Sequence, residues 1–174
     1  MSKLKPAVSN ADHIQGNTHA QVELVEYGDY QCPHCGMAYP IIKNIQMRMG
    51  AGLKFVFRNF PLSEMHPNAV SAAVATEAAA LQNKFWEMHD ILFEHQNHLD
   101  DKSLVKYAAH LGLGLPKFEQ DFEKPELMEK VDNDFESGVR SGVNGTPTFF
   151  VNGEKYNGSW EEAEFIGYLE GLLK

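Results

Sequence analysis

The segment that decides the fold is VELVEYGDYQCPHC, residues 22–35. Its first six residues predict a strand, because they are rich in β-branched side chains and are bounded by Gly28 and Asp29. Both faces of this strand are largely apolar, which predicts a central strand covered on both sides. A helix is expected to begin at the two cysteines that follow, because Pro33 suits the first helical position, where its missing N–H costs nothing.

Strands and helices alternate outward from this segment. Residues 13–15 predict a short edge strand, and apolar residues at helical spacing from Met37 to Met49 continue the helix. Residues 53–57 predict the next strand. The order strand, helix, strand, with a connection of this length, indicates a parallel crossover.

The remaining patterns predict a helical segment and a final hairpin. Residues 67–142 show helical periodicity without a strand pattern, which indicates four or five helices. Asn152-Gly153 between two β-rich stretches predicts a hairpin. Ser159 with Glu162 predicts the capping box of a last helix. The fold class is therefore α/β, in the order β-α-β, helical insertion, β-β-α.

The domain prediction follows from this order of elements. The chain of 174 residues suits one domain, spanning residues 1–174. Its core is expected at about 13–62 and 143–174, and its helical insertion at about 63–142.

Composition and charge exclude several classes of protein. Hydrophobic residues make up 43% of the chain, which excludes wholesale disorder. Fifteen Lys and Arg against 24 Asp and Glu give a net charge of −9, so no nucleic-acid partner is expected. No apolar run approaches about 18 residues, so no membrane insertion is expected. The start of the chain shows no signal peptide, which favours the cytoplasm; the alternative is a periplasmic or extracytoplasmic protein whose signal has been removed.

The two cysteines, Cys32 and Cys35, are the only ones in the chain. A thiolate at Cys32 would be stabilised by the unpaired N–H groups and partial positive charge of a helix start. Thiols at helix starts and in CxxC pairs have pKa values of about 3.5–7.5, against about 8.5 for a free thiol. Cys32 is therefore the predicted attacking sulfur and Cys35, one turn on, the resolving sulfur. His34 between them would further favour the thiolate.

Three interpretations of the pair compete with redox chemistry. A structural disulfide between such near neighbours closes a tiny loop and constrains little. Zinc would need two more ligands, from His34, His66 or the pair His95 and His98, and none has finger-like spacing from the cysteines. Two inert buried thiols are the third interpretation. Redox chemistry is favoured, and no metal site is predicted. His89, His95 and His98 are expected on a solvated helix face.

Cys32-Pro33-His34-Cys35 after a central strand, together with Gly145-Thr146-Pro147-Thr148 before the hairpin, resembles the DsbA-like branch of the thioredoxin superfamily. The resemblance covers residues 13–173, including the helical insertion. It implies a thioredoxin-like fold of the kind found in bacterial disulfide oxidoreductases. It also implies that Pro147 is a cis-proline facing the cysteines and that Thr146 binds an extended peptide through its backbone.

The resemblance gives Glu26 a role as well. Thioredoxin-like proteins often place a buried acid six residues before the first cysteine, as a proton relay for the resolving cysteine. Burial would raise the pKa of such a carboxyl towards neutrality. The alternative is an exposed glutamate at a sheet edge. Asp29 is a second acid near Cys32 and would oppose thiolate formation.

These observations predict an enzyme, a protein disulfide oxidoreductase that exchanges a Cys32–Cys35 disulfide with protein thiols. The Pro33-His34 pair favours a DsbA-like oxidant, whereas Thr146 and the absent signal peptide allow a cytoplasmic reductase or isomerase. A non-catalytic peptide-binding module of the same fold is the other alternative. The redox-active disulfide is the only cofactor expected. The expected partners are unfolded or partly folded protein thiols and a recycling protein or glutathione.

Overall fold

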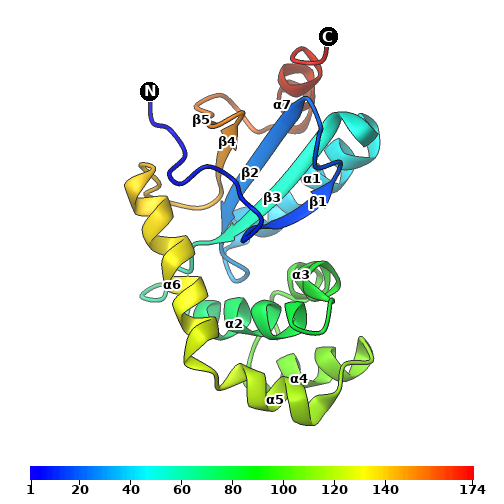
Figure 1. Ribbon diagram of the computed structural model, residues 1–174, viewed down its shortest axis with the longest axis vertical. Helices are drawn as coiled ribbons and strands as arrows, with labels where there is room; N and C mark the ends of the chain where they lie inside the picture. Colours follow the sequence, from blue (N-terminus) through cyan, green and yellow to red (C-terminus); the bar gives the residue numbers. More distant parts are fainter.

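The structure, a computed structural model that describes residues 1–174, is built around a five-stranded mixed sheet (Figure 1). The strands are β1 (His13–Gly16), β2 (Val22–Gly28), β3 (Leu53–Asn59), β4 (Thr148–Val151) and β5 (Glu154–Lys155). Their order across the sheet is β1-β3-β2-β4-β5. β2 and β3 are parallel, while the other neighbours are antiparallel. The prediction that β2 is a central strand is confirmed.

The alternation of β2 places its side chains in two separate cores. Val22 and Leu24 belong to the larger core, whereas Val25 and Tyr27 belong to a smaller one on the opposite face. All four are fully buried. Because both faces carry apolar side chains, the strand can be covered on both sides, and Glu26 is left facing the larger core among apolar neighbours.

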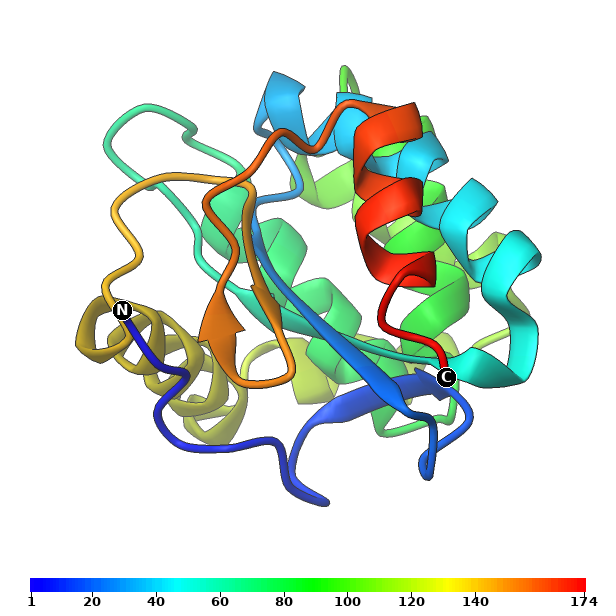
Figure 2. The same ribbon diagram turned by 90° about the horizontal axis from the view of Figure 1, so that it is seen from above.

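Helices cover the two faces of the sheet unequally. α1 (Pro33–Met49) and α7 (Glu162–Glu170) lie together on one face, and α6 (Pro125–Arg140) lies on the other (Figure 2). Phe135 of α6 stacks on Phe60, with ring centroids 4.3 Å apart. α1 begins at Pro33, as predicted, so the cysteine pair sits at the end of the central strand and the start of the helix that covers it.

Five helices separate β3 from β4, within the predicted range of four or five. They are α2 (Ala69–Ala80), α3 (Phe85–Glu94), α4 (Asp101–His110), α5 (Leu115–Phe122) and α6. α2 to α5 form a layer below the sheet in Figure 1, and α6 returns the chain to β4. α2 contacts each of the other four, because its alanines allow close approach on several sides. No helix in residues 1–174 has the length and hydropathy needed to span a membrane.

The chain differs from prediction in two places. His89, expected on a solvated face, is only 3% exposed, because aromatic residues of β3 and α3 surround its ring. The cap of α7 is the Glu161 side chain, which accepts a hydrogen bond from the Ala163 N–H, rather than Ser159. The turn at Asn152-Gly153 agrees with the predicted hairpin, since both residues have positive φ, of 49° and 84°.

Candidate active site at the start of helix α1

The two cysteines occupy different positions relative to α1. Cys32 is the residue before the helix and has an extended backbone, with φ −72° and ψ 124°, whereas Cys35 lies in the first turn. Both are free thiols. The extended backbone of Cys32 turns its side chain back over the helix start, where the N–H groups of the first turn have no partner within the helix. Both residues are buried, at 4% and 0% exposed, so the pair combines one buried thiol just before the helix with one in its first turn.

The surroundings of Cys32 stabilise its thiolate. Its pKa falls from 9.0 to about 5, chiefly because the Cys35 thiol hydrogen-bonds to it. The Thr146 side chain and the N–H groups of Cys35 and His34 also lower this pKa. Burial acts to raise it, but the lowering effects together are larger. When it is protonated, the Cys32 thiol donates to the Thr146 carbonyl oxygen at 3.6 Å, and this contact is separate from the effects that lower its pKa. At neutral pH the sulfur is therefore mostly thiolate, the form that attacks disulfides.

Cys35 has the opposite character. It is fully buried, and burial raises its pKa well above 9.0. The hydrogen bond to Cys32 and the charges of Glu26 and Cys32 also raise it. The Asp29 N–H, which lies 3.5 Å from the Cys35 sulfur, lowers the pKa but does not offset these effects. At neutral pH Cys35 holds its proton.

Glu26 is buried in the centre of the sheet and is not at an edge. It pairs in register with Phe57 of β3 and Phe149 of β4 and is 3% exposed. Its Oε1 has no hydrogen-bond partner. Burial, and secondly the Cys32 charge, raise its pKa from 4.5 to about 8. The sequence alternative of an exposed edge glutamate is therefore wrong, and Glu26 is a protonated acid near neutrality that interacts with both thiols.

The segment that precedes β4 lies opposite the cysteines. β4 pairs with the central strand β2, and this pairing carries Thr146 and Pro147 to the helix start. The Thr146–Pro147 peptide bond is cis. Thr148 Oγ1 donates to the Gly145 carbonyl at 2.7 Å, which holds the turn. Segments more than a hundred residues apart in the sequence thus meet at Cys32.

His34 and Pro33 are both exposed. His34 affects Cys32 through its backbone N–H, and no hydrogen bond reaches its ring. Pro33 occupies the first position of α1, as predicted. Of the predicted site residues, the structure brings Cys32, Cys35 and Glu26 together with Thr146 and Pro147, while His34 contributes its main chain.

Sequence patterns gave no indication of two further polar groups at the site. Gln96, in the loop after α3, donates from Nε2 to the carbonyls of Tyr30 and Cys32, both at 2.9 Å. His66, a candidate zinc ligand from the sequence, donates instead through Nδ1 to the Asp29 carboxylate at 2.7 Å. Both come from the helical insertion, so no local spacing pattern could reveal them. Gly36 was the one available signal, because a Cβ there would lie 2.1 Å from Gln96 Oε1.

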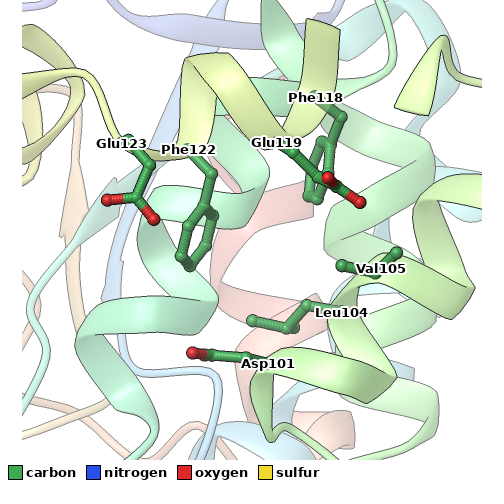
Figure 3. Close-up of a pocket in the computed structure, with 7 residues that line it drawn as sticks. All are labelled: Asp101, Leu104, Val105, Phe118, Glu119, Phe122 and Glu123. Atoms are coloured by element: carbon green, nitrogen blue, oxygen red, sulfur yellow. The ribbon is translucent and has the colours of Figure 1, made fainter. Parts of the chain in front are cut away.

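Two hollows lie in different parts of the fold, one beside α1 and one within the helical insertion. One, of about 520 Å³, lies between α1 and the loop before α7 and is lined by Met37, Ile41 and Trp160 among others. The other, of about 220 Å³, lies between α4 and α5 in the insertion (Figure 3). Four apolar residues and three carboxylates line it, and none of them is a site residue. None of the residues that line the first hollow is a site residue either, but two of them, Met37 and Ile41, belong to the helix that the cysteines begin.

Comparison with known proteins places these features in a family. A family model described as Thioredoxin matches residues 8–170. Among curated proteins, a Na(+)/H(+) antiporter NhaA 1 of Mycolicibacterium vanbaalenii is 41% identical over 169 residues, which are 96% of this chain and 27% of that protein. The NhaA of Herminiimonas arsenicoxydans is 39% identical over 168 residues, with shares of 96% and 27%. The chain spans about a quarter of these relatives, so the antiport in their names refers to much longer proteins.

Solved structures share the fold over nearly the whole chain. A thioredoxin-like oxidoreductase from Silicibacter pomeroyi superposes with a TM-score of 0.82 at 24% identity, covering 94% of this chain and 92% of that one. The thiol-disulfide exchange protein alpha-DsbA2 from Wolbachia pipientis gives 0.83 at 20% identity, with coverages of 94% and 88%. BdbD from Bacillus subtilis gives 0.81 at 24% identity, with coverages of 94% and 93%. The predicted thioredoxin-like fold with a helical insertion is confirmed.

Proposed function

The chain belongs to the thioredoxin family, and we propose that it is a thiol–disulfide oxidoreductase that oxidises protein thiols, in the manner of DsbA. The observation that carries the proposal is the contrast between its two thiols. The pKa of Cys32 is lowered to about 5, while that of Cys35 is raised well above its usual value. Exchange needs one sulfur that attacks and leaves as a thiolate and another that stays protected until a mixed disulfide forms.

The oxidising reaction begins with the Cys32–Cys35 disulfide. A client thiolate attacks the Cys32 sulfur, the Cys32–Cys35 bond breaks, and its electron pair leaves on Cys35. A second client thiolate then attacks the client sulfur of the mixed disulfide and displaces Cys32 as a thiolate. The client gains a disulfide and the enzyme becomes a dithiol, so two electrons pass from client to enzyme. The low pKa of Cys32 makes it a good leaving group in the second step.

Glu26 supplies the proton that Cys35 needs. Cys35 leaves the disulfide as a thiolate in an apolar environment that raises the pKa of its thiol. Glu26 carries a proton near neutrality, because its pKa is about 8, and its Oε1 has no hydrogen-bond partner that would hold it elsewhere. We assign it the role of the acid that protonates Cys35 when the disulfide opens, and of the base that removes this proton when it closes.

The direction of electron flow follows from the same pKa contrast. A stabilised thiolate at Cys32 favours the dithiol over the disulfide, which makes the disulfide more oxidising. The hydrogen bonds that lower the pKa of Cys32 therefore support an oxidant over a reductase. Regeneration then requires an acceptor of two electrons, either a recycling protein or oxidised glutathione. The redox-active disulfide itself is the only cofactor in this proposal.

The surroundings of the thiols support a protein as the substrate. Thr146 lies beside Cys32 with its carbonyl and the adjoining backbone next to the sulfur, where an extended peptide can align. The hollow of about 520 Å³ beside α1 offers apolar surface for one client side chain. Met37 on its rim is 61% exposed, and a flexible thioether suits varied sequences.

The test compares two activities in the parent and in Cys32→Ser. The parent is expected to oxidise a reduced, unfolded client and to reduce insulin with dithiothreitol present, and Cys32→Ser is expected to lose both. Retention of either activity in Cys32→Ser would contradict the mechanism. A parent without turnover, together with peptide binding that survives in the Cys32→Ser/Cys35→Ser double variant, would instead support a binding module.

A further inference from the structure

Asp29 takes no part in the exchange described above, yet its backbone contacts both cysteines and its carboxylate is buried. Its side chain is 0% exposed, and it lies in the loop between β2 and Cys32. Burying a carboxylate is costly unless hydrogen bonds compensate. Hydrogen bonds to this carboxylate must therefore compensate for its burial.

Three donors hold the Asp29 carboxylate. Oδ1 accepts from the Gln31 N–H at 2.8 Å. Oδ2 accepts from the Leu62 N–H at 2.9 Å and from His66 Nδ1 at 2.7 Å. Leu62 and His66 belong to the segment between β3 and α2, at the entry to the insertion. One side chain thus joins the loop before Cys32 to the insertion.

The backbone of Asp29 faces the two cysteines. Its N–H points at the Cys35 sulfur, 3.5 Å away, and its carbonyl accepts from the Cys32 N–H at 3.1 Å. This N–H donates to the Cys35 sulfur and acts to lower the pKa of the Cys35 thiol, so it favours the thiolate. The residue whose side chain is fixed by the insertion is therefore the residue whose backbone contacts both thiols.

We propose that Asp29 is a positioning residue for Cys35, held by His66 and Leu62 so that its backbone N–H stabilises the Cys35 thiolate. The proposal rests on the proposed function and concerns the step in which Cys35 acts. In that step the Cys35 thiolate attacks the Cys32 sulfur of a mixed disulfide, the bond between Cys32 and the client breaks, and the client leaves as a thiolate. In the oxidising direction the same N–H stabilises Cys35 as it leaves.

His66 Nδ1 is the donor of its hydrogen bond to Asp29, because an ionised carboxylate can only accept. Its side chain is 14% exposed, so the pair lies at the margin of the core. The geometry of the resolving cysteine therefore depends on a histidine that the sheet does not supply. This dependence gives the insertion a part in the chemistry, besides covering the site.

The first variants change the hydrogen bonds to the Asp29 carboxylate and leave the cysteines intact. Asp29→Asn replaces one carboxylate oxygen by an N–H₂ group that cannot accept, so the amide cannot satisfy the Gln31 N–H and the Leu62 and His66 donors at the same time. His66→Leu removes the imidazole donor, and His66→Asn restores an N–H donor at the position of Nδ1. Asp121→Asn is the matched control, since that carboxylate in α5 is 1% exposed and is held by two lysines away from the thiols.

The kinetic readout is the release of a client from a preformed mixed disulfide with Cys32, in which Cys35 is the attacking thiol. Asp29→Asn and His66→Leu are expected to slow this release about tenfold, as for a lost hydrogen bond to a charged group. The pH profile of Cys32 alkylation in the dithiol is expected to change little. His66→Asn should restore much of the parent rate, and Asp121→Asn should match the parent.

The spectroscopic readout needs no exchange activity. The amide proton resonance of Asp29 reports the N–H···S hydrogen bond and is expected to shift upfield in His66→Leu and in Cys35→Ala, but to keep its position in His66→Asn and Asp121→Asn. A parent that never releases the client would refute the proposed function, while this resonance would still decide the role of Asp29. An unshifted resonance in His66→Leu, parent-like release in Asp29→Asn, or equal slowing in Asp121→Asn would overturn the inference.

Discussion

Replacing Glu26 by glutamine should stabilise the reduced protein at neutral pH, although the substitution is made in the core. The pKa of Glu26 is about 8 in the folded protein, against 4.5 for an ordinary glutamate. Between these values the folded state holds a proton that the unfolded chain has released. Stability therefore falls as the pH rises from 4.5 to about 8, because the unfolded state binds fewer protons.

The size of the effect follows from this window. From 4.5 to pH 7 the protonation penalty amounts to about 3 kcal/mol, at about 1.36 kcal/mol per pH unit. Glutamine is neutral at every pH and has nearly the shape of the protonated acid. The substitution breaks no hydrogen bond to Oε1, because Oε1 of Glu26 has no partner in the parent. Glu26→Gln should therefore gain up to about 3 kcal/mol at pH 7 and almost nothing near pH 4.5.

The assay is urea unfolding of the reduced parent and the variant across this pH range. Glu23→Gln is the matched control, because Glu23 lies on the same strand but pairs with Lys54 at 2.8 Å and is 23% exposed. It should lose stability by at most about 1 kcal/mol, as for an exposed ion pair. In the oxidised protein the gain from Glu26→Gln should shrink, because the Cys32 charge that helps to raise the pKa of Glu26 is gone. A gain independent of pH, or a loss at pH 7, would contradict a raised pKa of Glu26 as the source of the effect.

Three further predictions concern the thiols and the loop that holds them. Cys35→Ala should raise the pKa of Cys32 by about 1–2 units, because it removes the hydrogen bond that lowers this pKa most; Cys35→Ser should raise it less, and ultraviolet thiolate absorbance against pH would measure both. Cys35→Ser should also accumulate mixed disulfides with clients through Cys32, visible by mass spectrometry; their absence would place the attacking thiol elsewhere. Gln96→Leu should slow client oxidation several-fold, because the Tyr30 and Cys32 carbonyls each lose a hydrogen bond. The substitution should leave Cys35 buried. Gly36→Ala should act in the same direction, since its Cβ would meet Gln96 Oε1, and parent-like rates in both variants would contradict this role.

Local sequence patterns were sufficient to predict those elements whose structure is set by residues adjacent in the sequence. The strand at residues 22–27, the proline-led helix start and the Asn152-Gly153 turn each carry their own signal, and the structure has all three. The burial of Glu26 was open from the sequence, because a glutamate on a strand is usually exposed. Its burial is decided by β3 and β4, which flank β2 on both sides.

The rest of the site depends on contacts between distant segments. Asp29 meets His66 and Cys32 meets Gln96 only because the insertion folds back onto the loop before α1. Amphipathic spacing placed His89 in solvent by default, but aromatic neighbours from β3 and α3 enclose it. The sequence of one segment holds no information on these partners, so the chemistry at the cysteines was predictable and the groups that position them were not.

The reduction potential of the Cys32–Cys35 couple, measured by equilibration with glutathione, decides whether the protein is an oxidant of thiols. The lowered pKa of Cys32 predicts a reversible disulfide with an oxidising potential. This potential should lie nearer to that of DsbA, about −120 mV, than to that of thioredoxin, about −270 mV. A potential near that of thioredoxin would contradict the oxidant, and the failure of any reversible disulfide to form would contradict thiol–disulfide exchange itself.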